Sequence, residues 1–152
     1  MALCFLGLNA VAQQSVSVYK IGDLLKRIHN TSDTIYVVNF WATWCKPCVA
    51  ELPEFEKLNL DQKNKPVKVL LVSLDFKEDM QSKLMPFIKK NNYTAEIVLL
   101  DEVNGNSFIN QVSEKWTGAI PATLITTQNR SKEVFLEKKL TEAIILEQIN
   151  AL

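Results

Sequence analysis

Two cysteines separated by two residues are the feature of this sequence that most plainly indicates chemistry. Cys45 and Cys48 enclose Lys46–Pro47 and follow directly on an apolar run. If Cys45 begins a helix, its sulfur faces unpaired backbone N–H groups and the positive end of the helix dipole, which favours the thiolate. Cys48 then lies one turn further on, where it can resolve a mixed disulfide formed at Cys45. The spacing therefore predicts thiol–disulfide exchange, with an exposed attacking sulfur and a less exposed resolving one.

Other uses of a cysteine pair fit this sequence less well. Structural zinc needs two further ligands, and the chain offers only His29 and Cys4 without metal-site spacing. A purely structural disulfide across so short a separation contributes little entropic stabilisation. A copper carrier would need a set of histidines or methionines beside the pair. We therefore expect a redox-active Cys45–Cys48 disulfide with no metal and no organic cofactor.

The overall composition is that of an ordinary folded protein. Of the 152 residues, 47% are hydrophobic and 22% are charged, which suits a domain with a substantial core. The 17 basic and 17 acidic side chains balance, so nothing favours nucleic acid or an anionic membrane surface as a partner. No repeat or Pro/Gly-rich linker divides the chain. We expect a single domain over residues 13–152 that works as a monomer.

The first twelve residues differ from the rest of the chain. They carry no charge, are largely apolar and end in Ala10–Val11–Ala12, a pattern typical of a signal peptidase site. Residues 1–12 are therefore predicted to be a secretory signal, too short to span a bilayer. However, no basic residue precedes the apolar run. Two alternatives therefore remain: Met1 lies inside a longer signal, or the segment is a buried N-terminal strand or helix. Cleavage would leave a mature, periplasmic or otherwise extracytoplasmic chain that begins near Gln13.

The remaining sequence alternates short apolar runs with helical patterns, which predicts a mixed α/β sheet. The Cys pair lies between a strand that is apolar on both faces and an amphipathic helix. Pro53 is predicted to kink that helix. Pro86 is predicted to break or bend the helix expected over residues 80–88. Thr141 is expected to cap the last helix. The expected helices cover residues 21–28, 48–58, 80–88 and 108–116 and a segment from 141, and the expected strands cover 35–40, 67–74, 97–100 and a hairpin of 122–126 and 133–136.

Two segments carry a family resemblance. Residues 37–48, VVNFWATWCKPC, closely resemble the active-site strand and loop of thioredoxin-like proteins, and above all of the TlpA/ResA branch of extracytoplasmic proteins. Residues 120–123, IPAT, are similar to the cis-proline segment of that family. The two motifs together align roughly residues 36–136. The resemblance implies a thioredoxin fold, a central mixed β-sheet flanked by helices, with a TlpA/ResA-like insertion around residues 75–100.

Carried over residue by residue, the resemblance makes Cys45 the nucleophile and Cys48 the resolving thiol. Pro121 would follow a cis peptide bond, with its ring against the disulfide, and Ile120 would offer backbone groups to an extended substrate peptide. The alternative without a functional role is that Pro121 is a trans proline at the start of a strand. The substrate-binding surface would be completed by Trp44, Lys46 and Pro47.

The departures from the family pattern are informative. Asn39 stands where many thioredoxins carry a buried aspartate, and asparagine cannot relay a proton. Glu51 stands three residues after Cys48, where the ResA-like branch carries a glutamate. We hypothesise that Glu51 exchanges protons with Cys48 and has a pKa raised by partial burial; the alternative is a glutamate on the helix surface. The glycine expected in the turn before the last strand is absent, since residues 128–131 read QNRS.

Partners follow from the resemblance as well. It implies protein thiols and disulfides as substrates, and a reductive direction with a membrane thiol-transfer protein as electron donor, as in cytochrome c maturation or envelope thiol repair. A thioredoxin-fold binding module or chaperone-like protein without turnover is one alternative, although the intact Cys pair argues against it. A thiol peroxidase is another, but it would need a Thr-x-x-Cys site with a nearby arginine. Minor expectations are a surface or C-cap role for His29, a turn role for Asp75, and packing of Trp116 below the Pro121 loop.

Overall fold

The computed structural model describes residues 15–29, 33–63, 65–127 and 130–152, so the predicted signal segment lies outside the described residues. Its centre is a six-stranded sheet in the order β1-β4-β3-β2-β5-β6. The first four strands in this order run parallel, and β5 is antiparallel to both β2 and β6. The strands are β1 Ser17–Tyr19, β2 Ile35–Trp41, β3 Val67–Ser73, β4 Glu96–Leu100, β5 Ala122–Thr126 and β6 Glu133–Leu136.

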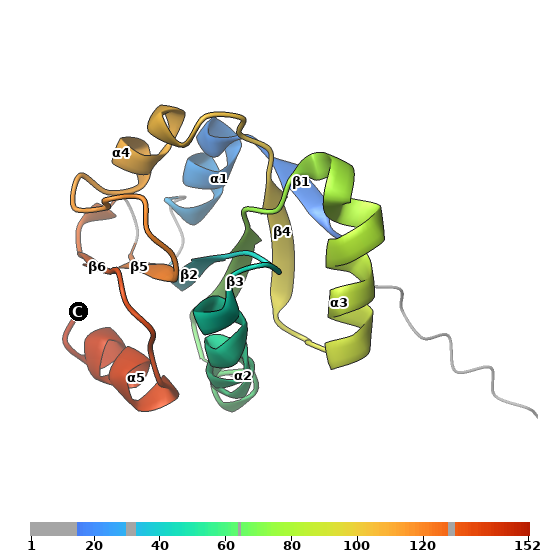
Figure 1. Cartoon of the computed structure of the whole chain (residues 1–152). Coiled ribbons are helices and arrows are strands. Elements are labelled where there is room, and N and C mark those ends of the chain that lie inside the picture. Colours follow the sequence, from blue (N-terminus) through green and yellow to red (C-terminus); the bar gives the residue numbers. More distant parts are fainter. Residues whose placement is uncertain (1–14, 30–32, 64, 128–129) are drawn as a thin grey trace, which may run out of the picture.

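Helices cover both faces of this sheet (Figure 1). One core layer packs the side chains of α2, α3 and α5 against one face, and a second layer packs α1, α4 and Trp116 against the other. Strand β2 is therefore buried on both faces, as its apolar sequence predicts. The helices are α1 Ile21–Ile28, α2 Lys46–Asp61, α3 Met85–Asn91, α4 Ile109–Val112 and α5 Glu142–Asn150. The expected mixed α/β sheet flanked by helices is confirmed.

One strand and one helix differ from the expectation, and two prolines fall within or between helices. The three-residue strand β1 carries too short a pattern to be predicted, and α4 covers only part of residues 108–116. Pro53 lies inside the assigned bounds of α2. Pro86 falls in the first turn of α3, directly after a π-helical turn at Met80–Leu84, where its missing N–H leaves few helical hydrogen bonds unmade. The segment from residue 75 to residue 100 thus contains a 3-10 turn, this π turn, α3 and β4.

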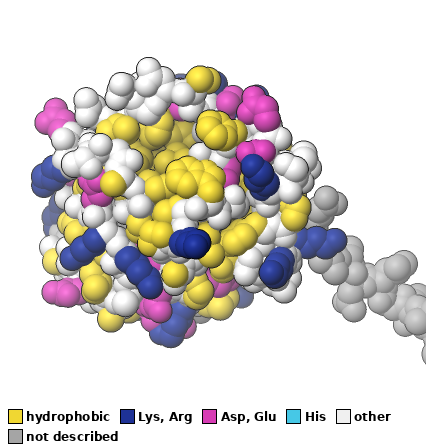
Figure 2. Space-filling model, in the orientation of Figure 1, with side chains coloured by type: hydrophobic (Ala, Val, Ile, Leu, Met, Phe, Trp, Pro, Cys, Tyr) yellow, Lys and Arg dark blue, Asp and Glu magenta, His cyan; other side chains and the backbone are white. Residues whose placement is uncertain are grey.

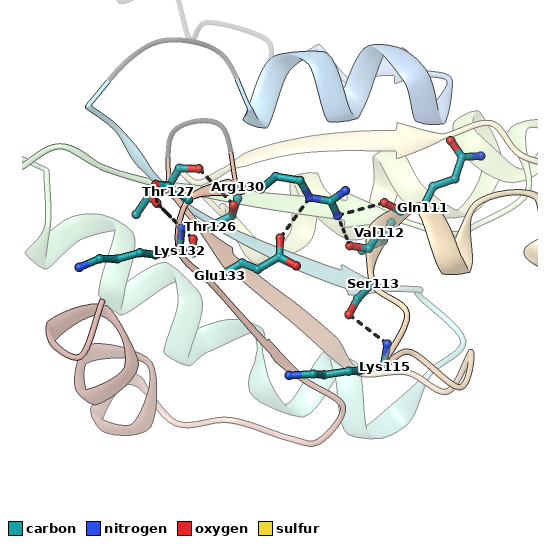
Figure 3. A network of polar contacts seen from close by, with 10 residues as sticks. Gln111, Val112, Ser113, Lys115, Thr126, Thr127, Arg130, Lys132 and Glu133 are labelled. Carbon is teal, nitrogen blue, oxygen red and sulfur yellow. Dashed lines mark hydrogen bonds and ion pairs between the residues drawn. The ribbon is translucent and has the colours of Figure 1, made fainter.

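The predicted hairpin of β5 and β6 is confirmed, and Arg130 occupies the place where a glycine was expected (Figure 3). Its φ of 56° lies in the left-handed region, which costs a residue with a side chain roughly 1–2 kcal/mol. The Arg130 guanidinium donates hydrogen bonds to the carbonyls of Gln111 (3.1 Å) and Val112 (2.7 Å) and pairs with Glu133 at 3.1 Å. A cation at the last carbonyls of α4 is favourable. The contacts of the Arg130 side chain thereby offset the free-energy cost of its left-handed backbone conformation, a cost that glycine would not have.

Thr141 caps α5 as expected, since its hydroxyl accepts a hydrogen bond from the N–H of Ile144. Leu140 and Ile145, which flank this helix start, are both fully buried, as in a hydrophobic staple. Within the described ranges, no helix is both long enough and apolar enough to cross a bilayer.

Candidate active site

The strand register brings the two distant motifs together. Phe40 of β2 pairs with Ala122 of the antiparallel strand β5, so the residues after Phe40 and those before Ala122 leave the sheet at the same edge. Cys45 Sγ consequently lies 3.8 Å from the carbonyl oxygen of Ile120. The Ile120–Pro121 peptide bond is cis, as the resemblance implies, and Pro121 is buried.

Cys45 is the N-cap residue of α2, and it is joined to Cys48 by a disulfide bond of 2.06 Å. The backbone N–H of Cys48 is directed at Cys45 Sγ, with a nitrogen–sulfur distance of 3.3 Å. In the reduced protein this donor and the positive end of the helix stabilise a thiolate at Cys45. Cys45 is 6% exposed and Cys48 is fully buried. The predicted order of exposure holds, but Cys45 is less exposed than the sequence suggested.

Around Cys45 the surface is apolar. Figure 2 shows hydrophobic side chains gathered across the middle of the face on which the loop from β2 to α2 runs. Trp44 is 62% exposed, and Phe76, which the sequence did not single out, is 70% exposed. Lys46 and Pro47 are also exposed, and Ile120 is half-buried. Large exposed apolar side chains such as Trp44, next to Cys45 in the chain, suit an interaction surface.

A buried carboxylate holds the loop in front of Cys45. Because Trp41 and Ser73 end the neighbouring parallel strands in register, Asp75 lies beside that loop. The Asp75 carboxylate accepts hydrogen bonds from the N–H (3.1 Å) and hydroxyl (2.6 Å) of Thr43, and from the Ser73 hydroxyl (2.7 Å). It is 3% exposed. Asp75 therefore fixes the segment that carries Trp44 and Cys45, a role that the turn expected from the sequence did not include.

Replacing Asp75 by alanine is expected to lower the free energy of unfolding by about 2–3 kcal/mol, because partly buried donors on Thr43 and Ser73 lose their acceptor. Urea unfolding monitored by circular dichroism measures the change. Asp79→Ala is the matched control, since the Asp79 carboxylate makes a surface ion pair with Lys83 at 2.8 Å, and is expected to cost at most about 0.5 kcal/mol. Equal destabilisation by the two substitutions would contradict the anchoring role of Asp75.

Glu51 is fully buried on α2, which excludes the surface alternative. Its carboxylate accepts hydrogen bonds from Asn39 Nδ2 (2.8 Å) and from the backbone N–H of Leu140 (2.7 Å). Burial raises the pKa of Glu51 to about 7, against the opposing effects of the Leu140 N–H, the Asn39 amide and the charge of Lys139. Glu51 and Cys48 lie on neighbouring turns of one helix, but no described hydrogen bond joins them. Glu51 is therefore a buried acid that can change charge near neutral pH.

Asn39 connects this acid to the sheet. Its Nδ2 also donates to the hydroxyl of Thr123 at 3.1 Å. Its Oδ1 is buried and has no hydrogen-bond partner in the described part of the chain. An unpaired buried acceptor is uncommon and costs free energy. The amide therefore makes the surroundings of Glu51 polar, and one of its own hydrogen-bonding atoms is left without a partner.

The minor expectations are met in two places. His29 is the C-cap residue of α1, and burial lowers the pKa of its imidazole. Trp116 lies beneath the cis-proline loop, where its indole N–H donates to the Ala119 carbonyl at 2.8 Å and its ring packs 4.8 Å from that of Phe40. Over the described ranges, no three His, Cys, Asp or Glu side chains form a group that could hold a metal ion.

Comparison with known proteins places these features in context. A sequence model of the AhpC/TSA family matches residues 23–131. The chain is 38% identical to the thiol-disulfide oxidoreductase ResA of Oceanobacillus iheyensis, with 38% of each chain covered. It is also 38% identical over 63 residues to the sporulation thiol-disulfide oxidoreductase A of Bacillus subtilis, covering 41% of this chain and 38% of that one. The matches thus span under two fifths of either relative's own length.

One solved structure is similar to this chain over a larger share of its length than these two relatives are. The thioredoxin-related protein from Neisseria meningitidis serogroup B superposes with a TM-score of 0.67 at 22% identity, covering 79% of this chain and 85% of that one. At this level of identity the likeness concerns the fold alone. The sheet and its flanking helices are those of the thioredoxin fold, as the sequence resemblance implied.

Proposed function

As the chain belongs to the AhpC/TSA family, we propose that it is a thiol–disulfide oxidoreductase that works on protein substrates through Cys45 and Cys48. One observation carries the proposal. The Cys45 sulfur caps α2, receives the N–H of Cys48 at 3.3 Å and lies 3.8 Å from the backbone of Ile120. An activated nucleophile therefore adjoins a backbone segment suited to an extended peptide.

In the reductive direction the cycle begins with the dithiol protein. The Cys45 thiolate attacks one sulfur of a substrate disulfide, forms a mixed disulfide and releases the first substrate thiolate. Cys48 then loses its proton and attacks Cys45 Sγ, which releases the second substrate thiolate and closes the Cys45–Cys48 disulfide. Two electrons pass to the substrate, whose thiolates take up two protons. A dithiol donor restores Cys45 and Cys48 by the reverse exchange.

We assign to Glu51 the proton exchange with Cys48. A buried thiol is a poor nucleophile until it loses its proton, and an acid with a pKa of about 7 can take up that proton near neutral pH. The location of Glu51 one turn after Cys48 supports the assignment.

The physiological setting is part of the same proposal. The names of the two curated relatives, both thiol-disulfide oxidoreductases, support a disulfide-exchange activity. We propose protein thiols and disulfides as substrates, a membrane thiol-transfer protein as electron donor, and a periplasmic or otherwise extracytoplasmic location. Cytochrome c maturation and envelope thiol repair are the processes that would use such a reductase.

Insulin reduction tests the activity, and equilibration with glutathione buffers tests its direction. We expect the protein to accelerate the precipitation of insulin by dithiothreitol, and its Cys45–Cys48 couple to have a potential well below that of glutathione. Absence of turnover would favour the binding-module alternative, and peroxide consumption that exceeds disulfide reduction would favour the peroxidase. A potential near or above that of glutathione would make the protein an oxidant or isomerase and refute the reductive direction.

A further inference from the structure

Glu137, in the segment that follows β6, contacts the cis-proline loop. Leu136 pairs with Thr123, so Glu137 leaves the sheet at the edge where Pro121 enters it. The Glu137 carboxylate accepts hydrogen bonds from the backbone N–H groups of Thr117 (2.9 Å) and Ala119 (3.1 Å), and a further one from the Thr117 hydroxyl. One carboxylate thus holds three donors of the loop directly before Ile120.

The loop is shaped so that these donors converge. Gly118 has a φ of +101°, a conformation that residues with a side chain rarely adopt. It turns the N–H groups on either side of it toward the same carboxylate, in the manner of a small backbone anion site. On its other side the loop is held by the indole of Trp116, which donates to the Ala119 carbonyl at 2.8 Å. Residues 117–119 are exposed, so these side-chain anchors replace the burial that would otherwise fix them.

The charge of Glu137 suits this task. The hydroxyl and N–H of Thr117 hold the pKa of the carboxyl below its usual value, so it is ionised at neutral pH. Hydrogen bonds from N–H groups to a carboxylate are shorter and stronger than those to a neutral acceptor. The loop therefore keeps its anchor under the conditions in which disulfide exchange takes place.

We propose that Glu137 is a positioning residue for substrate capture, whose carboxylate holds residues 117–119 so that the Ile120 backbone meets the polypeptide on either side of a substrate disulfide. The inference rests on the proposed function. It makes Glu137 important for disulfides carried on an extended peptide, which uses the Ile120 backbone. A small disulfide without a peptide backbone reaches Cys45 without those contacts and does not depend on Glu137.

The test compares two disulfides in steady-state assays with the full chain. For Glu137→Ala we expect KM for insulin to rise about five- to tenfold with kcat little changed, because anchoring hydrogen bonds to a charged group are lost. Glu137→Gln retains one acceptor and should give a smaller rise. The rate with bis(2-hydroxyethyl) disulfide and the reduction potential of Cys45–Cys48 should equal those of the wild type. Glu114→Gln, which alters an exposed glutamate near the same loop, should change none of these quantities.

Each other outcome has a definite meaning. An unchanged KM for insulin in Glu137→Ala refutes the inference and leaves the proposed function standing. A parallel loss with both disulfides assigns Glu137 a general structural role and also refutes it. A wild-type protein that reduces neither disulfide refutes the proposed function, and the inference falls with it.

Discussion

Cys45→Ser is expected to abolish disulfide reduction, with a fall in kcat/KM on the order of a thousandfold or more, because serine at this position supplies no thiolate. The helix start and the N–H of Cys48 that favour charge on sulfur do little for a hydroxyl, whose pKa is far higher. Insulin reduction measures the loss. Thermal unfolding should show that the variant remains folded, since the exchange of sulfur for oxygen leaves the packing of α2 nearly unchanged.

Cys48→Ser should fail at a different step. Cys45 can still attack a substrate disulfide, but nothing resolves the product, so a mixed disulfide accumulates and is visible on a non-reducing gel or by mass spectrometry. Cys4→Ser is the matched control and should reduce insulin like the wild type. Accumulation of the mixed disulfide in Cys45→Ser instead would reverse the roles of attacking and resolving cysteine, and a loss of activity in Cys4→Ser would break the assignment to a two-cysteine site.

Glu51 is expected to make the protein less stable as pH rises. Its pKa is about 7 when folded and near 4.5 in its ordinary state, so between these values the folded chain binds a proton that the unfolded chain has released. The free energy of unfolding then falls by about 1.4 kcal/mol per pH unit, or about 3 kcal/mol in total, from pH 4.5 to pH 7. Above pH 7 both states are ionised and this contribution is constant.

Glu51→Gln should remove that dependence, because glutamine has the shape of the protonated acid and does not titrate. Urea unfolding at a series of pH values compares the variant with wild type, and the difference at pH 8 should favour the glutamine. Glu147→Gln, an exposed glutamate on α5, should retain the wild-type slope. The pH dependence of alkylation at the resolving thiol of the reduced protein should also change in Glu51→Gln alone; identical profiles would end the proposed proton exchange with Cys48.

The parts of the fold that the sequence predicts are those with a strong local pattern. Strands β2, β3 and β5 are largely apolar runs, and α2 follows the N-cap residue Cys45 and has Pro47 in its first turn, a favourable helix start. The Cys pair and the Ile-Pro segment carry the chemistry in their residue types. Their proximity follows once β2 and β5 are neighbours.

The rest depends on contacts that no local pattern encodes. Glu137 and Asp75 read as ordinary polar residues at the ends of strands, and only the register of the sheet aims their carboxylates at the loops beside Cys45. The same holds for Arg130, whose positive φ is offset by carbonyls on a helix eighteen and nineteen residues earlier in the chain. The short strand β1 forms because β4 offers it a parallel edge.

The hydrogen bond from Leu140 to Glu51 has a consequence for biosynthesis. It joins residues that are 89 positions apart, so the Glu51 carboxylate on α2 gains this backbone donor only after Leu140 has left the ribosome. Premature termination before Leu140 would remove that donor together with α5 and leave an acid beside the resolving cysteine in contact with water. Truncated products that end before Leu140 should therefore be more open to proteolysis around α2 than the full chain, which limited proteolysis would measure.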